Sequence, residues 1–560
     1  MNLKHDMANV IYHALERKVE TERVYQLIET PKHAHLGDLA FPCFQLASVF
    51  RMPPNELATN LAVHLTSPWI EHVETAGGYL NIFLKRSYVT AHLINEVNAL
   101  SKAYGSSRMG KGHVMTIDYS SPNIAKPFSM GHLRSTVIGN SLAQLAEKCG
   151  YKTVKINHVG DWGTQFGKLM AAYLRWGDEA QVRTNPIHEL LALYVRFHEE
   201  AEQSPEINDD GRHWFKKLEE GDREAESLWT WFREESLQAF STIYEALGIT
   251  FDSYDGEAFY NDKMDDVVKL LRDKGLLVES DGAEVVPLEG LPPCLIKKRD
   301  GTTLYATRDL AAAIYRYDTY GFKKSLYVVG NEQSLHFQQL FNVLKKMGFT
   351  WPDTMSHISF GMMLNDGKKM STRKGQVVLL EEVMNEAVAL ALVNIEEKNP
   401  TLANKEEVAK QVGIGAIVFH DLKHDRRHDI TFSLSEMLKF EGETGPYIQY
   451  THARAASLLE KGEYKGKPEI VKITDESSWP VIKYLMTFPE VIERAFNQHD
   501  PSQVAKFIID LAQAFNHYYG TAKILADNEE KESRLALVSS VKVVLHEGLR
   551  LLGIKAPNNM

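Results

Sequence analysis

Apolar and polar positions change their period several times along this chain, and the clearest change lies between His113 and Gly160. The segment HVMTIDYS is a short apolar run with the length of a buried strand. GHLRSTVIGNSLAQLAEKCG has apolar residues at helical spacing and ends on a glycine, which commonly stops a helix. YKTVKINHVG fits a second strand. A strand, a helix and a strand within about 45 residues predict a βαβ unit and hence a parallel sheet.

This α/β pattern stops and later resumes. From about 165 to 254 the chain is charged and has helical periodicity, and we expect a helical insertion over about 165–290. Strand-like runs return in KSLYVVG and SHISFG. They follow an Asp300–Gly301 pair that favours a hairpin turn and a helix that begins near Thr307. From about Glu381 to the end, nearly every segment has helical periodicity.

These changes divide the chain into domains. We expect a small α+β domain over 1–108 and a Rossmann-like α/β domain with a parallel sheet over 109–380. A helical region over 381–440 and an all-α domain over 441–560 follow. A chain of 560 residues is too long for one hydrophobic core and fits two to four domains.

Composition narrows the class of protein. Hydrophobic residues make up 44% and charged residues 24%, and no apolar run approaches the ~18 residues of a membrane span. The N-terminus has mixed charge and no apolar signal core, so we expect a cytoplasmic protein without membrane association. The net charge of −11 argues against non-specific coating of nucleic acid but allows a local basic groove. The three cysteines form no C-x-x-C pair, so we expect neither a disulfide framework nor a cysteine zinc site.

The turn after the first strand, SSPNIAKPFSMGH, contains residues that suit a polyphosphate. Ligands of doubly wound sheets bind beyond the carboxyl ends of the strands, where this turn lies. Gly131 leaves room beside the backbone, the first amides of the helix favour an anion, and His132 and Lys126 can meet its charge. The turn matches neither G-x-x-x-x-G-K-[ST] nor G-x-G-x-x-G. A turn glycine and a capping histidine are an equally good interpretation of these residues taken alone.

A second motif, GKKMSTRKG, begins about 235 residues later. It contains four cations that repel one another unless an anion lies near them, namely Lys368, Lys369, Arg373 and Lys374. A solvated basic loop is the common alternative. Cationic loops also close over triphosphates during catalysis, so the motif supports a phosphate site.

Together the two motifs resemble the signatures of class I aminoacyl-tRNA synthetases. SMGH is similar to the His-x-Gly-His motif, and KMSTR is similar to the Lys-Met-Ser-Lys-Ser motif. Further segments are similar to those of arginyl-tRNA synthetases, in order and over nearly the whole chain: SSPNIAKPFSMGHLRST, HVGDWGTQFG, WFKKLEEGD, LYATRDLAA and EGETGPYIQYTHARA. Two positions depart from the signatures, because Ser129 replaces the first histidine and Arg373 replaces the second lysine. Ser129 cannot be a cation, so Lys126 is a candidate for the missing charge.

The resemblance implies an arginine–tRNA ligase. It would activate L-arginine with ATP, supplied as its Mg²⁺ complex, and transfer arginine to the 2′-hydroxyl of the terminal adenosine of its tRNA. Because positioning and charge stabilisation carry most of such a reaction, the implied catalytic residues are Lys126, Gly131, His132, Lys369, Ser371 and Arg373. The implied ATP contacts are Pro122, Ser129, Gly131, His132, His336 and Met370. The implied arginine contacts are Asp118, Asn123, Tyr305, Asp309 and Gln333.

Each of these side chains also has a structural interpretation. Tyr305 and Asp309 at i and i+4 would share one helical face. Taken alone, however, Asp309 suits a charge at a helix N-terminus, Tyr305 suits core packing, and His336 suits either packing or ATP contact. A pocket built for the donor-rich arginine side chain can reject lysine without an editing domain.

The resemblance further implies a tRNA-elbow-binding domain over 1–108, a stem-contact region over 381–440 and an anticodon-binding domain over 441–560. The implied tRNA contacts are Tyr79, Asn81, Tyr447, Tyr450, Arg454 and Met560. Aromatic rings can stack on unpaired bases and arginine can pair with phosphate, although half-buried helix tyrosines explain the same residues equally well. We expect a monomer without protein-bound zinc.

Two other functions stay open at this point. One is a synthetase for another amino acid or a small nucleotidyltransferase, although the latter has no need of a helical C-terminal domain of about 120 residues. The other is a catalytically silent relative that only binds RNA, which the loss of the first signature histidine favours. Gly131, His132 and the cationic motif count against the silent relative.

Overall fold

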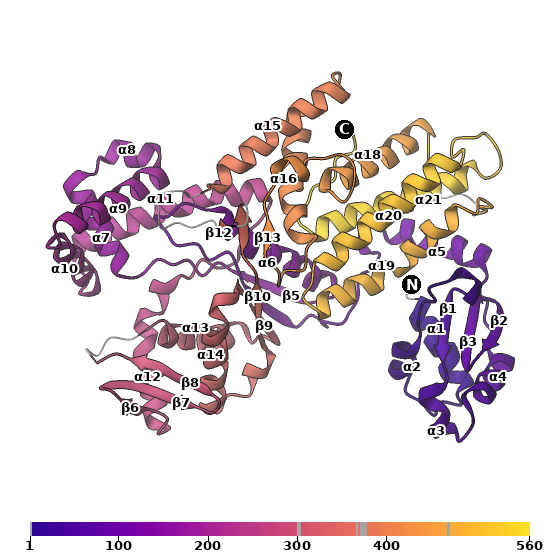
Figure 1. Cartoon of the computed structure of the whole chain (residues 1–560), viewed down its shortest axis with the longest axis horizontal. Helices are drawn as coiled ribbons and strands as arrows, with labels where there is room; N and C mark the ends of the chain where they lie inside the picture. The colour runs from indigo at the N-terminus through magenta and orange to yellow at the C-terminus, as the bar shows by residue number, and fades with distance from the viewer. Residues whose placement is uncertain (1–2, 300–303, 366–367, 370–377, 467–470) are drawn as a thin grey trace.

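The computed structural model describes residues 3–299, 304–365, 368–369, 378–466 and 471–560. Figure 1 shows an elongated molecule with a parallel sheet near its middle. A group of insertion helices lies at one end, and the N-terminal domain lies at the other, below the C-terminal helices in this view. The sheet is therefore the element from which the other parts extend.

The central sheet confirms the four predicted parallel strands. They are β4 (Val114–Asp118), β5 (Lys152–Ile156), β9 (Lys324–Gly330) and β10 (Met355–Phe360). All neighbours pair in parallel, in the order β10-β9-β4-β5. Three helices connect or flank them in sequence: α6 (Met130–Lys148), α13 (Tyr305–Tyr320) and α14 (Ser334–Lys346). Because β5 and β9 lie on opposite sides of β4, the carboxyl ends of β4 and β9 form the switch point at which such sheets bind ligands.

The insertion begins with helices, as predicted, and ends differently. Its helices are α7 (Thr164–Trp176), α8 (Glu179–Thr184), α9 (Pro186–Gln203), α10 (Ile207–Glu219), α11 (Arg223–Leu247) and α12 (Met264–Asp273). The prediction of helix to about 290 is wrong, because an antiparallel sheet follows, made of β6 (Val278–Ser280), β7 (Ala283–Leu288) and β8 (Leu291–Lys297). Asp281 and Gly282 both have positive φ (51° and 79°), as a tight hairpin turn between β6 and β7 requires. The predicted Asp300–Gly301 turn lies outside the described residues.

The N-terminal domain is a three-stranded antiparallel sheet with helices against it. Its elements are α1 (Leu3–Ala14), α2 (Thr21–Leu27), β1 (Leu39–Pro42), α3 (Ala47–Phe50), α4 (Pro54–His64), β2 (Ile70–Ala76) and β3 (Tyr79–Leu84). The next helix, α5 (Arg86–Leu100), packs instead against α19 (Ser478–Asn497) and α21 (Lys531–Leu551). Asn98 on α5 donates hydrogen bonds to the Ala536 carbonyl oxygen (3.1 Å) and the Ser540 hydroxyl (2.8 Å) of α21. Helix α5 therefore lies within the predicted domain 1–108 but packs with the C-terminal helices.

The part of the chain from Leu380 onward is helical in its described residues, apart from one short strand that the prediction omitted. Its other helices are α15 (Leu380–Lys398), α16 (Lys405–Leu422), α17 (Leu434–Met437), α18 (Gly445–Lys461) and α20 (Ser502–Thr521). The strand β13 (Ile430–Thr431) pairs with β11 (Met363–Asn365), which also pairs with β12 (Lys368–Lys369). The segment that leads into the second motif is therefore joined to the helical region. In the part of the chain that the structure describes, no helix is both long and apolar enough to cross a bilayer.

A buried ion pair joins α6 to α16. The side chains of Arg134 and Asp421 are each 1% exposed, and Arg134 Nε donates to Asp421 Oδ2 at 3.1 Å. Arg134 Nη1 also donates to the carbonyl oxygens of Gly361 (2.7 Å) and His428 (2.9 Å). Arg134 therefore holds the chain after β10 and the turn before β13 against the helix that begins at the predicted phosphate site.

Candidate active site and RNA-contact surface

The turn between β4 and α6 has a strained backbone that neighbouring elements hold in place. Ser120, Ser121 and Ala125 have positive φ angles of 73°, 47° and 58°, which residues other than glycine adopt rarely. The Ser120 amide donates to Ser135 Oγ, and the Ala125 amide donates to Ser236 Oγ, both at 2.9 Å. Strained backbone of this kind persists where the surroundings over-determine it, and it is concentrated at ligand sites.

Ser129 and His132 form the first turn of α6. The Ser129 amide donates to Nδ1 of His132 at 3.1 Å, and the Ser129 hydroxyl lies at the same distance from that nitrogen. Burial lowers the pKa of His132 to about 4, so the ring is neutral at pH 7. With Nδ1 accepting, the ring proton is on Nε2. His132 therefore presents a neutral N–H donor, and Ser129, in place of a signature histidine, orients that ring.

The chain just after the second motif lies against the first motif, although the two segments are far apart in sequence. Ser129 forms an antiparallel bridge with Leu379, and the Met130 amide donates to the Val378 carbonyl oxygen at 3.2 Å. Val378 and Leu379, which follow the second motif, are thereby fixed at the start of α6. Of the predicted residues in this motif, the structure describes Lys369 as part of β12, while Met370, Ser371 and Arg373 lie outside the described residues.

Gly131 and Lys126 lie at the same end of α6. A Cβ added at Gly131 would meet only the Ser129 hydroxyl, at 3.5 Å, so the space beside it is open to a ligand. The Lys126 ammonium lies 5.7 Å from the centroid of the Tyr194 ring in α9, and burial lowers its pKa. Lys126, the cation predicted to meet the phosphate, therefore lies beside the ring of a tyrosine from the insertion.

Gly160 lets the turn approach the chain after β5. A Cβ at Gly160 would lie 2.1 Å from Asn123 Oδ1, and the Gly160 amide donates to the Pro122 carbonyl oxygen at 3.0 Å. Pro122 is buried, whereas Asn123 is partly exposed. Pro122 therefore shapes the turn from inside, and Asn123 keeps surface for a ligand.

A second cluster lies where α13 meets the carboxyl ends of the strands. His336 Nε2 is 2.6 Å from Asp309 Oδ2, and His158 Nε2 is 4.0 Å from Asp309 Oδ1. Burial would raise the pKa of Asp309, but the hydrogen bond from His336 together with the charges of His336, His158 and Arg316 outweighs burial, so that pKa is lowered. Burial disfavours protonation of His336, yet the same hydrogen bond raises its pKa. Nε2 of His336 is thus bonded to Asp309, and the ATP contact of His336 stays a prediction.

Asp118 is a buried carboxylate whose two oxygens both have partners near this cluster. Its Oδ2 is 2.8 Å from Nη1 of Arg316, with side chains 8% and 2% exposed, and its Oδ1 accepts a hydrogen bond from Ser121 Oγ at 2.9 Å. Since both oxygens have partners and the residue is buried, Asp118 positions α13 and the strained turn. Its predicted contact with arginine stays a prediction.

Tyr305 and Gln333 keep exposed surface at the same edge. Tyr305 is the first residue of α13 and is 60% exposed, so the core-packing interpretation of this tyrosine is wrong. Gln333 is exposed in a short 3-10 helix, η5 (Asn331–Gln333), directly after β9. Both side chains are therefore free to meet a ligand beside Asp309.

The structure adds Glu257, which the sequence analysis missed. Burial raises the pKa of Glu257 to about 7, with Asp309 adding to the shift and Arg308 opposing it. Asp161, 1% exposed, accepts a hydrogen bond from the Ala258 amide at 2.8 Å and so holds the turn that carries Glu257. Two carboxylates close enough to influence each other suit a guanidinium. The segment SYDGEAFYND contains several acids, and nothing in its pattern distinguished this one.

Among the predicted RNA contacts, Arg454 lines a cavity of 510 Å³ between the C-terminal domain and the chain after α15. Its guanidinium carbon lies 5.0 Å from the ring centroid of Tyr450 and 4.9 Å from that of Tyr519, and Met560 lines the same cavity. Tyr447 lies behind this group and is joined to it through Asn516. Tyr450 and Tyr519 are 39% and 43% exposed, so both rings are available to a base.

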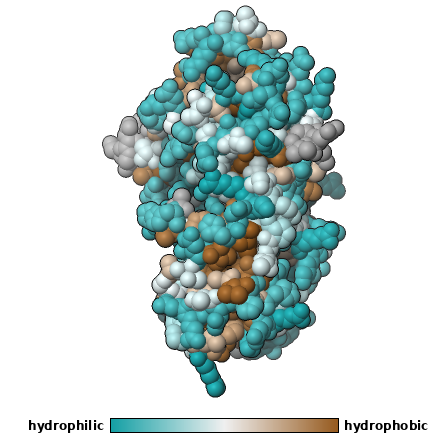
Figure 2. Space-filling model, turned by 90° about the vertical axis from the view of Figure 1, so that its right-hand side faces the viewer, coloured by the Kyte–Doolittle hydropathy of each residue, from teal (hydrophilic) through white to brown (hydrophobic). Residues whose placement is uncertain are grey.

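Tyr79 and Asn81 lie on β3 of the N-terminal domain. The Tyr79 ring is partly exposed and lies 5.3 Å from the ring of Phe44, which is 48% exposed. Figure 2 shows that this side of the molecule is mostly hydrophilic, with one hydrophobic patch in the lower half, over the N-terminal domain. Asn81 is only 5% exposed, so its predicted contact with RNA is not supported, and Tyr79 is the better candidate.

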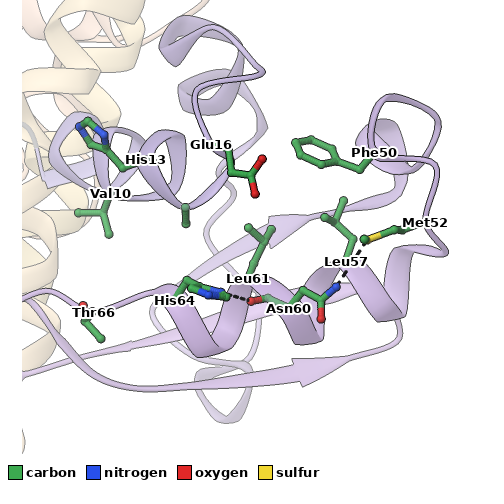
Figure 3. Close-up of a pocket in the computed structure, with 11 residues that line it drawn as sticks. Val10, His13, Glu16, Phe50, Met52, Leu57, Asn60, Leu61, His64 and Thr66 are labelled. Carbon is green, nitrogen blue, oxygen red and sulfur yellow. Dashed lines mark hydrogen bonds between the residues drawn. The ribbon is translucent and has the colours of Figure 1, made fainter.

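A separate cavity of 660 Å³ lies among α1, α3 and α4 (Figure 3). His64 Nδ1 is 2.8 Å from the Asn60 carbonyl oxygen, and Asn60 Nδ2 is 3.5 Å from Met52 Sδ, so polar groups here bond to one another. We assign this cavity no ligand. Within the described ranges, no three His, Cys, Asp or Glu side chains are grouped to hold a metal ion.

The described fold and site match known families along the whole chain. The model for tRNA synthetases class I (R), catalytic domain, matches residues 94–434, the DALR anticodon binding domain matches 448–560, and the arginyl tRNA synthetase N terminal domain matches 5–84. The fold and its nucleotide-type site are thus those of a class I aminoacyl-tRNA synthetase.

Similar proteins narrow this class. Arginine–tRNA ligases of Exiguobacterium sibiricum and Enterococcus faecalis are 58% and 55% identical to the chain, and each alignment covers all of both proteins. The arginyl-tRNA synthetase of Thermus thermophilus has a similar structure, with a TM-score of 0.84, 26% identity and full coverage of both chains. The chain belongs to the arginyl-tRNA synthetase family.

Proposed function

We propose that this protein is an arginine–tRNA ligase that activates L-arginine with ATP and then charges its tRNA. One observation carries the proposal. The open start of α6, with Gly131 and His132, and the acidic cluster around Asp309 lie at the same carboxyl edge of one parallel sheet. A polyphosphate and a guanidinium substrate can therefore be held together at the switch point.

In the first step, a carboxylate oxygen of arginine attacks the α-phosphorus of ATP, and pyrophosphate leaves. His132 donates a neutral Nε2–H to a phosphate oxygen, Gly131 gives the phosphate access to the helix start, and Lys126 adds positive charge. The second motif joins from β12, with Lys369, Met370, Ser371 and Arg373 as further ATP contacts. Magnesium enters with ATP as part of the substrate, and Ser129 and Pro122 keep the turn in shape.

The guanidinium of arginine is bound by Asp309 and Glu257. Two carboxylates match a planar cation with five donors, and Tyr305, Gln333 and Asn123 contact the rest of the amino acid. Asp118 acts through Arg316 by holding α13 in place. The ammonium of lysine has three donors on one nitrogen and lacks the planar fork of five, so it pairs with fewer of the carboxylate oxygens and no editing domain is required.

In the second step, the 2′-hydroxyl of the terminal adenosine attacks the carbonyl carbon of arginyl-adenylate, and AMP leaves. Tyr450, Tyr519 and Arg454 contact unpaired anticodon bases, with Tyr447 and Met560 supporting them, while Tyr79 contacts the tRNA elbow. All of these residues are on one chain, which favours a monomer. Use of tRNA, ATP and free arginine favours a place in the cytoplasm.

Amino-acid-dependent ATP–pyrophosphate exchange tests this function. All twenty amino acids are assayed with and without total tRNA, using the wild type, His132→Ala and a matched control, His188→Ala, on the surface of α9. We expect exchange with arginine, dependent on tRNA, that is lost in His132→Ala and kept in the control. Exchange with another amino acid would overturn the pocket assignment. Absence of exchange under every condition would favour an RNA-binding protein without activity.

A further inference from the structure

Helix α11 of the insertion contacts both halves of the proposed active site with one of its faces. Five side chains of this face follow one another at spacings of three or four residues: Trp229, Arg233, Ser236, Phe240 and Tyr244. Such spacings place side chains along one stripe of a helix. At about 1.5 Å per residue the stripe is about 22 Å long. A single element can therefore reach both the turn between β4 and α6, named here the phosphate turn, and the arginine pocket.

Tyr244 is part of a buried hydrogen-bond network that holds the phosphate turn. Its hydroxyl oxygen lies 2.8 Å from Ser120 Oγ and accepts a hydrogen bond from Asn157 Nδ2 at 2.9 Å. Asn157 Oδ1 accepts a hydrogen bond from the Ser121 amide at 3.1 Å. Because Tyr244 and Asn157 are both buried, water cannot replace these bonds. Tyr244 therefore helps to hold Ser120 and Ser121 at their positive φ angles.

Ser236 and Phe128 extend this support to the rest of the turn. Ser236 Oγ accepts a hydrogen bond from the amide of Ala125, the third strained residue, at 2.9 Å. Phe128 meets the ring of Tyr244 edge to face, with 5.6 Å between centroids, and lies 5.3 Å from the ring of His132. Ser236 and Phe128 are buried, so both contacts are shielded from water. The strained residues and His132 thus pack on α11, directly or through one neighbour.

The N-terminal half of the same face reaches the arginine pocket. Arg233 Nε donates to Asp161 Oδ2 at 2.8 Å, and Trp229 Nε1 donates to the Asp161 carbonyl oxygen at 2.7 Å. The other carboxylate oxygen of Asp161 accepts a hydrogen bond from the amide of Ala258, the residue after Glu257. Asp161 is buried, so the cation of Arg233 stabilises a charge that water does not reach. Arg233 therefore acts on the position of Glu257 through Asp161.

Asn123 lies on the phosphate turn but is held from another direction. It forms a parallel bridge with Gly160, and the amide of Ile124 donates to the Gly160 carbonyl oxygen at 3.1 Å. Asp161 directly follows Gly160, so this proposed arginine contact is fixed by the same segment that Arg233 holds. Changes at the two ends of α11 should accordingly affect different substrates.

We propose that α11 positions both substrate sites, with Tyr244 and Ser236 as positioning residues for the phosphate turn and Arg233 as the positioning residue for the arginine pocket. This inference rests on the proposed function, because the phosphate turn and Glu257 contact ATP and arginine only in that reaction. Each of the three side chains acts through the group that it holds. One helix of the insertion thereby sets the distance between the two substrates.

Dissociation constants for ATP and for L-arginine, each measured alone by calorimetry, separate the two ends of the helix. We expect Tyr244→Phe and Ser236→Ala to weaken ATP binding about tenfold, because each removes a hydrogen bond that holds the turn, and to leave arginine binding unchanged. We expect Arg233→Gln to weaken arginine binding about tenfold with ATP binding unchanged. Arg233→Lys keeps a cation beside Asp161 and should regain most of the lost affinity.

Arg223→Gln, at the exposed start of α11, and Tyr88→Phe, on the surface of α5, are the matched controls and should keep both constants. Equal weakening of ATP and arginine binding by Tyr244→Phe and by Arg233→Gln would overturn the proposal, because the variants would then act on the fold as a whole. An unchanged ATP constant in both Tyr244→Phe and Ser236→Ala would also overturn it. So would an Arg233→Lys variant that binds arginine as weakly as Arg233→Gln. A wild type that binds both ligands but shows no pyrophosphate exchange would refute the proposed function alone, since binding does not require turnover.

Discussion

Replacing Arg134 by methionine tests how much the buried pair between α6 and α16 stabilises the protein. Methionine keeps much of the volume but leaves Asp421, 1% exposed, without its cation. Within the described residues, Asp421 Oδ1 already has no hydrogen bond. Removing one partner of a buried ion pair costs about 3–5 kcal/mol, because the other charge stays buried and unpaired. We expect the free energy of unfolding to fall by that amount, measured from the urea midpoint at constant slope.

The destabilisation by Arg134→Met should depend on pH, and its direction follows from the pKa shift of Asp421. Burial raises the pKa of Asp421, with Arg134 opposing the shift. When the pKa of a carboxyl is higher in the folded state than in the unfolded state, the folded state loses stability as pH rises through that pKa. Without Arg134 the pKa of Asp421 rises further. The loss of unfolding free energy in Arg134→Met should therefore be largest near pH 8 and should shrink toward pH 5.

A double variant provides the control. Arg134→Met with Asp421→Leu removes the buried charge, so it should regain most of the lost stability at pH 8 and lose the added pH dependence. A deficit of Arg134→Met below about 1 kcal/mol would refute the reasoning, as would a double variant that is less stable than the single one.

Three further changes test the site. Ser129→Ala removes the hydroxyl beside His132 Nδ1 and should lower the kcat of pyrophosphate exchange about tenfold with arginine KM unchanged. Gly160→Ala places a Cβ 2.1 Å from Asn123 Oδ1, which must move, so arginine KM should rise about tenfold or more. Burial raises the pKa of Glu257 to about 7, so its ionised fraction rises from about a tenth at pH 6 to about nine tenths at pH 8. Arginine KM should fall about tenfold over this range, and Glu257→Gln should remove the slope.

Each of these changes has a matched comparison. Gly520→Ala, where a Cβ meets nothing within 4 Å, should leave arginine KM unaltered. Glu279→Gln on the exposed strand β6 should keep the wild-type pH slope. An arginine KM in Gly160→Ala equal to the wild-type value would exclude Asn123 from the pocket. A wild-type kcat in Ser129→Ala would mean that the Ser129 amide alone orients His132.

The sheet and the phosphate-facing turn could be predicted because their signals are local. Four apolar runs each fit one strand, and the turn residues follow the first run directly. The hairpin of β6 and β7 was missed, because its strands are short and partly polar and only the Asp281–Gly282 pair marks the turn. Charged strands at the surface resemble charged helices when period alone is considered.

The electrostatics of the pocket could not be predicted, because they depend on which groups meet in space. Asp309 and His336 are 27 residues apart and bond to each other, so the same contact orients the acid and engages Nε2 of the histidine. Asp118 carries the same charge as Asp309 but is neutralised by Arg316. Glu257 enters our proposal because the fold buries it within electrostatic reach of Asp309, and a single sequence shows neither its burial nor this neighbour.

The position of α5 decides how this protein can be dissected. Lys85 is the single residue between β3 and α5, so the N-terminal domain leads directly into a helix that packs with the C-terminal helices. A hydrogen bond from Trp479 Nε1 to Asp38 Oδ1 (3.3 Å) also links this domain to α19. Removal of residues 1–108 would strip α19 and α21 of a packed partner and would leave Ser540 without Asn98. Removal of residues 1–84 would keep that helix in place. The modular unit of this protein therefore ends at the last strand of its first sheet, and the following helix secures the N-terminal domain to the rest of the molecule.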